Sequence, residues 1–224
     1  MNLRHVDWQF VIPLQSGCYT LLWESPALFE RLVTELVGQM NGKDGGFFVE
    51  ENYEEVPLTK ALWLLYSPYM MDVNEKKIIT RLYKEVEAGL QIDYMEEYLE
   101  IERTLMSLVD RIQLGNNLQI QHSDHLQVGQ LLKSMNLQVE QDADCHVIER
   151  LYSYVDTVTK YFQPQGFVCV QFRDYFTDEQ LHVFAQEMKM KHIGVIFLES
   201  HNGRRAFPDE IVYTIDESWC ELYE

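Results

Sequence analysis

The chain has 224 residues, of which 46% are hydrophobic and 24% are charged, and this ordinary globular composition excludes a disordered tail protein. It has 36 acidic and 18 basic side chains, so its net charge of −18 opposes binding to anionic membranes, and to nucleic acid unless the cations are focused in one place. No stretch approaches the roughly 20 apolar residues of a membrane span, and the four cysteines form no Cys-x-x-Cys pair, so we expect a cytoplasmic protein with reduced thiols and no membrane partner.

The N-terminal part of the chain predicts a strand followed by a helix. Residues 18–23 are typical of a short buried strand. Ser25 and Pro26 then suit the N-cap and the first turn of a helix, and apolar residues between Leu28 and Met40 recur at helical spacing. A further strand is predicted at residues 47–49, after two consecutive glycines.

The middle of the chain is predicted to be helical. Residues 74–112 carry one apolar stripe from Ile78 to Leu90 and another from Ile101 to Ile112. Two long neighbouring helices of this kind favour an antiparallel hairpin that projects as a unit. A shorter helix is predicted around residues 126–135.

The C-terminal part predicts an alternation of helices and strands. Core positions within residues 147–162 indicate a helix. Residues 167–172 and 193–198 are apolar without alternation, as strands covered on both faces are. Between these strands, the sequence Thr177-x-x-Gln180 forms a capping box at the start of a helix. This βαβ unit predicts two parallel strands.

Taken in order, these elements predict an α/β fold in two parts. Strands and helices alternate at both ends of the chain, and helices occupy its middle. We expect one discontinuous α/β head domain, formed by residues 1–57 and 142–224, with a mostly parallel sheet and a last strand at 211–215. An inserted α-helical leg domain is expected at residues 58–141.

The turn after the first predicted strand lacks the residues that bind nucleotide phosphate. A phosphate-binding loop has the pattern Gly-x-x-x-x-Gly-Lys-Ser/Thr, whereas Glu24-Ser25-Pro26 brings an acidic residue and a proline. The carboxylate would repel phosphate, and proline has no backbone N–H to donate. We therefore expect neither nucleotide binding nor ATP hydrolysis, and no other arrangement of catalytic residues is readable in the sequence.

Two groups of residues are candidate metal ligands. His122, Asp124 and His125 are close enough in sequence to meet one ion on a helix, but Asp124 fits equally well as the N-cap of the helix that follows. Acidic runs at residues 50–55 and 96–102 are more typical of solvated surfaces than of cation sites. The pattern thus favours a structural role for both groups.

The basic residues form two candidate phosphate-binding groups. Lys77, Arg81 and Lys84 are spaced i, i+4 and i+7 and share one helical face, with Lys76 beside them. Arg204-Arg205 follow the predicted strand 193–198, in a loop that contains glycine. Such groups could track phosphates, but glutamates lie close to the first, and the pattern alone favours a solvated surface.

Several short sequence strings occur along the chain in an order and spacing that chance does not explain. They are Met1-Asn2-Leu3, Ile12-Pro13-Leu14-x-x-Gly17, Thr20-Leu21-Leu22-Trp23-Glu24, Phe29, Leu131-Leu132-Lys133-Ser134-x-x-Leu137-x-Val139-Glu140, Val195-Ile196-Phe197-Leu198-Glu199, Phe207-Pro208 and Ile215-Asp216. By these strings, almost the full chain resembles the small CRISPR-associated protein family of type II-A systems that acts in acquiring new spacers.

This resemblance implies a fold and a function. Family members have an α/β head related to P-loop ATPases but lacking the active motif, and a helical leg. Four copies form a ring whose hole admits double-stranded DNA, and the ring slides onto DNA ends without sequence preference and without known catalysis. It works with the adaptation integrase and the type II effector nuclease, and calcium stabilises it. The resemblance therefore implies a non-catalytic, DNA-end-binding homotetramer.

A ring would also reconcile the net charge with DNA binding, because cations can line the hole while acidic residues face outwards. Contacts of this kind go to phosphate and carry no sequence information. The candidates for the lining are Lys76, Lys77, Arg81, Lys84, Lys133, Arg204 and Arg205.

The calcium site that the resemblance implies is depleted in this sequence. The family has a carboxylate-rich run just before the Leu131–Ser134 segment, whereas several residues are neutral here. Asp124 and Glu140 match acidic family positions. Because calcium takes six to eight oxygen ligands and their charge tunes its affinity, either calcium binds weakly through Asp124 and Glu140 or the ring is held without it.

Two other functions stay open at this point. An acidic interaction protein that binds a basic partner is favoured by the net charge and opposed by the cationic stripe. A divergent metal-dependent nuclease would use the His122–His125 region and is opposed by the lack of a clear carboxylate cluster.

Overall fold

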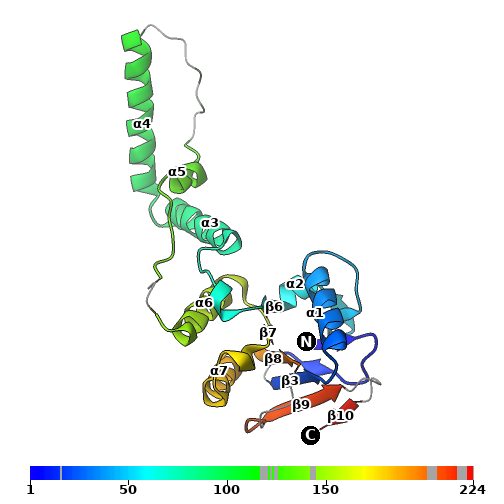
Figure 1. Cartoon of the computed structure of the whole chain (residues 1–224). Coiled ribbons are helices and arrows are strands. Elements are labelled where there is room, and N and C mark those ends of the chain that lie inside the picture. The colour runs from blue at the N-terminus through cyan, green and yellow to red at the C-terminus, as the bar shows by residue number, and fades with distance from the viewer. Residues whose placement is uncertain are drawn as a thin grey trace. The chain divides into compact units, whose positions relative to one another are not determined.

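The structure, a computed structural model, describes residues 1–15, 17–116, 121, 123, 126–141, 145–200, 206–215 and 221–223. The chain divides into two compact units (Figure 1). Unit 1 consists of Met1–Met71 and Asp144–Glu224, and unit 2 consists of Asp72–Ala143. Unit 2 is therefore an insertion between two segments that together form unit 1.

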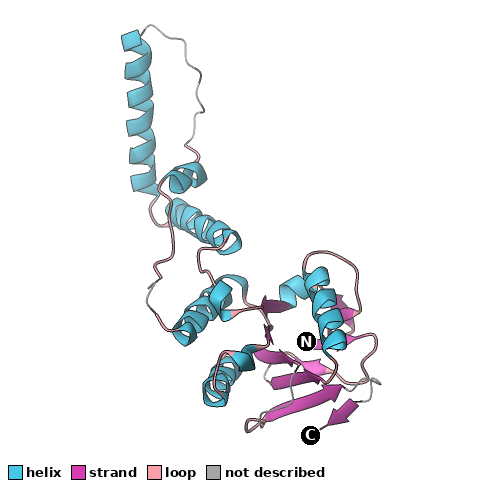
Figure 2. Ribbon diagram, viewed as in Figure 1, coloured by secondary structure: helices cyan, strands magenta, loops and turns pink. Residues whose placement is uncertain are grey.

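Unit 1 is built on a six-stranded sheet with the order β10-β9-β3-β8-β7-β6. Figure 2 distinguishes the strands of this unit from its helices by colour. The strands from β9 to β6 are parallel to their neighbours, and β10 is antiparallel to β9. The predicted α/β fold with a mostly parallel sheet is confirmed. The strand bounds are β3 Cys18–Trp23, β6 Leu62–Leu65, β7 Gly166–Val170, β8 Gly194–Glu199, β9 Glu210–Ile215 and β10 Glu221–Tyr223.

The predicted βαβ unit is present as β7, α7 and β8. Helix α7 (Asp178–Met190) joins the two strands, which are neighbours in parallel register. The capping box forms as predicted, since the Gln180 N–H donates to Thr177 Oγ1 over 3.2 Å and the Thr177 N–H donates to Gln180 Oε1 over 3.0 Å. Leu181, Phe184 and Met188 then bury the core face of α7.

A second, antiparallel sheet of unit 1 was not predicted. Its order is β2-β1-β4-β5, and it contains the strand expected at 47–49, which the structure extends to Glu51. Two of its strands are only two or three residues long, so they show no readable alternation. The bounds are β1 Asn2–His5, β2 Ile12–Pro13, β4 Phe47–Glu51 and β5 Glu54–Val56.

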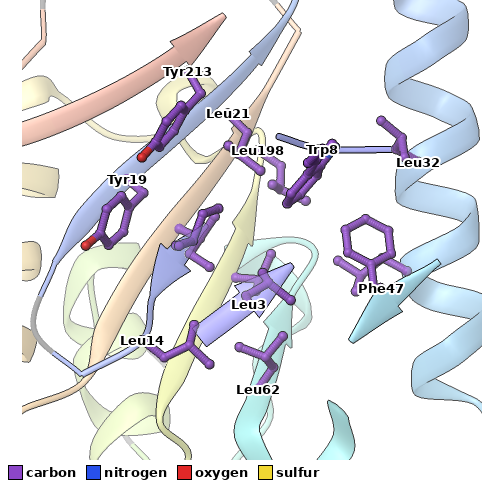
Figure 3. Packing of buried hydrophobic residues seen from close by; sticks show 14 of the residues in the cluster. Leu3, Trp8, Leu14, Tyr19, Leu21, Leu32, Phe47, Leu62, Leu198 and Tyr213 are labelled. Carbon is purple, nitrogen blue, oxygen red and sulfur yellow. The ribbon is translucent and has the colours of Figure 1, made fainter. Parts of the chain in front are cut away.

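The core cluster of unit 1 combines residues of both sheets with residues of α1 (Pro26–Met40) and α2 (Leu58–Ala61) (Figure 3). Large apolar side chains from both ends of the sequence meet there, which commits the two chain segments to one domain. Labelled in the figure are Leu3, Trp8, Leu14, Tyr19, Leu21, Leu32, Phe47, Leu62, Leu198 and Tyr213. Ser25 precedes α1 as expected, but its side chain makes no capping hydrogen bond.

Helix α6 (Val147–Phe162) packs against β6 in the same unit. Trp63 of β6 stacks near Phe162, with ring centroids 4.8 Å apart, and its indole N–H donates to Tyr154 Oη over 3.2 Å. At the start of α6, the His146 N–H donates to the Glu149 carboxylate over 2.9 Å. Two short 3₁₀ helices complete the described unit, η1 (Pro68–Met70) and η2 (Phe172–Asp174).

The expected boundary between head and leg at residue 57 differs from the division seen here. Residues 58–71 were assigned to the helical leg, but they contain β6, which pairs with β7 in parallel register. The four apolar residues of β6 are too few to distinguish a buried strand from part of a helix. The insertion accordingly starts at Asp72.

Unit 2 contains α3 (Lys76–Ile92), α4 (Met95–Asn116) and α5 (Val128–Ser134). The expected packing of α3 and α4 as a hairpin along their apolar stripes is wrong, because the stripe of α4 is exposed to solvent. Tyr98 of α4 donates its hydroxyl to the Leu126 carbonyl over 2.9 Å. The structure thus leaves α4 without a helix along its apolar side among the described residues.

A buried ionic group links three elements of unit 1. Arg173, on η2, donates to the carboxylate of Glu210 at the start of β9, and the Thr20 hydroxyl of β3 donates to the same oxygen. The second oxygen of Glu210 accepts the Phe207 N–H over 2.7 Å. The guanidinium carbon lies 4.5 Å from the centre of the Phe207 ring. Burial of this kind is tolerated only when each charge is paired and hydrogen-bonded.

We expect Glu210→Gln to destabilise the protein by about 3–5 kcal/mol, because it leaves Arg173 buried without its main counter-charge. The neighbouring Asp209→Asn removes the same charge from an exposed pair with Lys189 and should cost no more than about 1 kcal/mol. Denaturant unfolding of the two variants makes the comparison. Equal losses would show that the buried pair contributes nothing beyond a surface pair.

Candidate nucleic-acid interface

The four basic residues predicted on one helix lie on α3 and are exposed. Lys77, Arg81 and Lys84 share one face, with Lys76 at its edge. Ile78, on another face, is fully buried. With a rise of 1.5 Å per residue, the stripe from Lys77 to Lys84 is about 10 Å long. Over that length B-form DNA carries about six phosphate charges.

The position of the lysines in α3 is unfavourable for the helix itself. Lys76 and Lys77 occupy its first turn, where no acidic residue lies. The positive end of the helix dipole disfavours cations there, typically by about 0.3–1 kcal/mol each. Burial lowers the pKa of Lys77, and the carboxylate of Glu75 opposes this shift. The helix start therefore concentrates positive charge, which suits an anionic ligand better than it suits helix stability.

The segment that contains α5 packs on α3, on a side of the helix other than this stripe. Gly129 lies against Glu87, and the Tyr83 hydroxyl donates to the Leu137 carbonyl over 3.4 Å. Lys133 is exposed and lies in sequence between these two contacts.

Two reciprocal hydrogen bonds fix the same segment at the start of unit 2. The Asn74 side chain donates to the Val139 carbonyl over 3.0 Å and accepts the Val139 N–H over 2.8 Å. These bonds join positions 65 residues apart in sequence. They hold the chain that follows α5 beside the beginning of α3.

Most of the remaining candidates cannot be placed. Arg204, Arg205 and Asp124, like His122 and His125, lie outside the described residues. Glu140 is described and exposed. Among the described residues, no three His, Cys, Asp or Glu side chains gather in a way that could hold a metal ion.

The turn after β3 has its backbone engaged within the sheet. The Glu24 N–H donates to the Ile215 carbonyl over 3.2 Å, and Pro26 occupies the first position of α1. Neither residue offers a free backbone N–H at the start of that helix. The positively charged stripe on α3 is therefore the more favourable anion-binding surface in the described chain.

The described cysteines near the sheet are poorly suited to thiol chemistry. Burial raises the pKa of Cys18 to about 12, and the nearby carboxylate of Glu210 adds to this effect. Burial likewise raises the pKa of Cys169 well above its usual range. Because the thiolate is the reactive form, both side chains act as packing groups.

The comparison with protein families shows which family the chain belongs to. The sequence model of the family described as "CRISPR-associated protein (Cas_Csn2)" matches residues 39–219, most of the chain. The chain belongs to the Cas_Csn2 family. The resemblance drawn from short strings is thereby confirmed at the level of the family, although the strings before residue 39 lie outside the match.

A likeness to a solved structure accompanies this assignment. This Cas_Csn2 protein is similar to the crystal structure of a nucleotide-free ATP-binding cassette from an ABC transporter, with 12% sequence identity and a TM-score of 0.49. The similarity covers 96% of this chain and 87% of the other. No curated protein matches the sequence. Among the described residues, no helix has both the length and the apolar composition needed to cross a membrane.

Sequence reasoning missed two features of this Cas_Csn2 chain that bear on its site. The packing of the α5 segment on α3 is accompanied by hydrogen bonds between distant residues, which no local pattern shows. The exposure of the apolar side of α4 was also missed, because a stripe indicates an apolar face without showing what covers it.

We expect the thiols of Cys18 and Cys169 to resist alkylation in the folded protein. With a pKa of about 12, only roughly one Cys18 side chain in 10⁴ is a thiolate at pH 8. Iodoacetamide labelling mapped by mass spectrometry, in buffer and in denaturant, measures this. Rapid labelling of Cys18 in buffer alone would contradict the prediction.

Proposed function

We propose that this protein is a non-catalytic, sequence-independent double-stranded DNA-end-binding protein that acts in spacer acquisition of a type II-A CRISPR system in the cytoplasm. It would work as a ring-shaped homotetramer with the adaptation integrase and the type II effector nuclease. Membership of the Cas_Csn2 family supports the assignment to CRISPR biology. The observation that carries the DNA contact is the exposed stripe of Lys77, Arg81 and Lys84 on α3.

Focused charge explains how an acidic chain would bind DNA. The stripe places three cations on one face, and Lys76 adds a fourth at the positive end of the helix dipole. Lys133, exposed on α5, is a further candidate for the lining. Four copies around a duplex would multiply these contacts, and outward-facing acidic residues would repel DNA from every other surface. Arg204 and Arg205 are further candidates for the lining.

We expect the triple variant Lys77→Gln, Arg81→Gln, Lys84→Gln to lose about tenfold or more of its affinity for linear duplex at moderate salt. Each phosphate contact removed should also reduce the slope of log K against log salt by about 0.9. Gel shifts with linear and covalently closed duplex of one sequence measure both effects, and the closed form should not bind.

The control for that variant removes three exposed lysines of unit 1, Lys43→Gln, Lys60→Gln and Lys189→Gln, and so changes the net charge equally. If both variants bind alike, the α3 stripe is not the contact. If the unaltered protein binds no DNA but binds a basic protein tightly, the net charge of −18 indicates an acidic interaction module instead. Metal-dependent loss of the DNA would indicate a nuclease.

Calcium is proposed to bind weakly, through Asp124 and Glu140. The described part of unit 2 presents Glu140 at an exposed position where water can complete the coordination shell. We expect calcium at millimolar concentration, but not magnesium, to raise the melting temperature by a few degrees through linkage. The double variant Asp124→Asn, Glu140→Gln should abolish the shift, whereas Glu54→Gln and Glu55→Gln on β5 should not. A melting temperature that ignores calcium would show that the protein is held without it.

A further inference from the structure

Two exposed tyrosines lie together where two strands of the large sheet end. Tyr69 is on η1, which follows β6, and Tyr175 comes directly after η2, which follows β7. Because β6 and β7 are parallel neighbours, the segments that follow them leave the sheet at the same edge. Ligands of open α/β sheets bind outside the carboxyl ends of the strands. The two tyrosines therefore stand at an edge where a ligand is expected.

The geometry of the two rings suits a cation. Their centroids are 5.7 Å apart and their planes meet at 78°, which is an edge-to-face contact. Although they touch, the tyrosines are 63% and 45% exposed. A pair of this kind leaves a corner that the face of one ring and the face of the other enclose. Because ring faces carry the negative part of the aromatic quadrupole, such a corner attracts cations and disfavours anions.

The backbone on which both rings are mounted is held in place. The Tyr69 N–H donates to Ser67 Oγ over 3.3 Å, and Pro68 between them is buried. The Tyr175 N–H donates to the Phe172 carbonyl over 3.0 Å, and the ring of Phe172 is fully buried. A ligand that enters the corner therefore orders little of the protein, which keeps the entropic cost of binding low.

The exposed charge beside the tyrosine pair is negative. Asp174 directly precedes Tyr175 and is exposed. Arg173, the cation of η2, points inward, since it is 8% exposed and pairs with Glu210 and, over 3.7 Å, with Asp178. The carboxylate of Asp174 thus adds to the attraction that the rings exert on a cation, and it would repel the phosphates of a nucleic acid.

We propose that Tyr69, Tyr175 and Asp174 bind an arginine side chain that a basic partner protein presents. A guanidinium is planar and weakly hydrated, so it can stack on one ring while its edge donates to a carboxylate. Consecutive Cα atoms are about 3.8 Å apart, which places the carboxylate within reach of a guanidinium seated on the neighbouring ring. A lysine ammonium is more strongly hydrated and does not stack, so it fits this corner less well.

The surroundings of the pair fit a protein as the bearer of that arginine. Met70, the residue after Tyr69, is 80% exposed. Its flexible thioether offers apolar contact to side chains that flank the arginine. Tyrosine, methionine and arginine are the residues that protein–protein interfaces enrich. The net charge of −18 favours a basic partner over an acidic one. The contact lies apart from the α3 stripe in sequence and does not rest on the proposed DNA binding.

A labelled peptide that alternates arginine with glycine probes the site in the full-length protein. Versions with lysine or citrulline in place of arginine control for charge and for shape. Fluorescence anisotropy at about 0.15 M salt measures binding while exposed charges farther than about 8 Å apart are screened. We expect the arginine peptide to bind most tightly, the lysine peptide more weakly and the citrulline peptide not at all. Equal binding of the arginine and lysine peptides would overturn the proposal.

Substitution of the rings shows whether the peptide binds at this pair. Tyr69→Leu and Tyr175→Leu keep an apolar side chain but remove the ring face, so each should weaken binding by about two- to fivefold and together by about tenfold. The corresponding phenylalanine variants should bind like the unaltered protein. Tyr53→Leu, at a 96% exposed tyrosine among glutamates, is the matched control. Circular dichroism checks the fold. Equal losses in the double variant and in Tyr53→Leu would contradict the proposed site.

Two further arms test the carboxylate and the class of ligand. Asp174→Asn should weaken binding of the arginine peptide by about twofold or more, whereas Asp44→Asn, at another exposed aspartate, should not. A labelled single-stranded oligonucleotide tests whether the rings stack bases instead. If the double tyrosine variant loses the oligonucleotide but still binds the arginine peptide, the pair is a base-stacking site and the proposal fails.

The variant of α3 separates this contact from the proposed function. The triple glutamine variant at Lys77, Arg81 and Lys84 should bind the arginine peptide no less tightly than the unaltered protein, since it removes only cations. The double tyrosine variant should bind linear duplex normally. Failure of DNA binding therefore leaves the arginine site standing, and loss of peptide binding in the α3 variant would place the peptide elsewhere and overturn it.

Discussion

The pairing of β3 with strands from the far end of the chain is the constraint on which unit 1 depends. Cys18 lies opposite Val195 on one side and opposite Glu210 on the other, so β3 is central in the sheet and cannot form before the C-terminal strands exist. Non-local pairing of this kind must overcome a large entropic cost before it gains any contact energy. The buried core between the two sheets supplies that energy from both ends of the sequence at once.

The charged residues buried in unit 1 and those on α3 of unit 2 differ in character. Within unit 1, the charged side chains that are buried are held by partners, as Arg173 is by Glu210, and they serve the packing of η2 against β9. The cations of α3 have the opposite character, since they are exposed and two of them lie where the helix dipole disfavours them. Residues that lower the stability of the element that carries them are good candidates for a functional role.

The sequence predicted those helices and strands whose surroundings require a recognisable pattern of apolar or capping residues. Residues 167–172 and 193–198 read as parallel strands because both faces are covered, and Thr177 with Gln180 fixed the start of α7 through hydrogen bonds local in sequence. Strands β1, β2, β5 and β6 were not predicted, because two to four residues carry too little periodicity. For the site, spacing alone placed Lys77, Arg81 and Lys84 on one face. The neighbourhood of Lys133, and the exposure of Leu105 on α4, depend on which segments pack together, and no local pattern records that.

The paired hydrogen bonds between Asn74 and Val139 bear on how the insertion is tolerated. They join the chain just after unit 2 begins to the chain just before it ends. The entropic cost of closing a loop grows with the number of free residues between its ends. Once this clamp forms, the chain that leaves β6 and the chain that enters α6 are connected through Asn74 and Val139 rather than through the whole insertion. The pairing of β6 with β7 then closes a shorter effective loop, and a change in the length of α4 adds little to that cost.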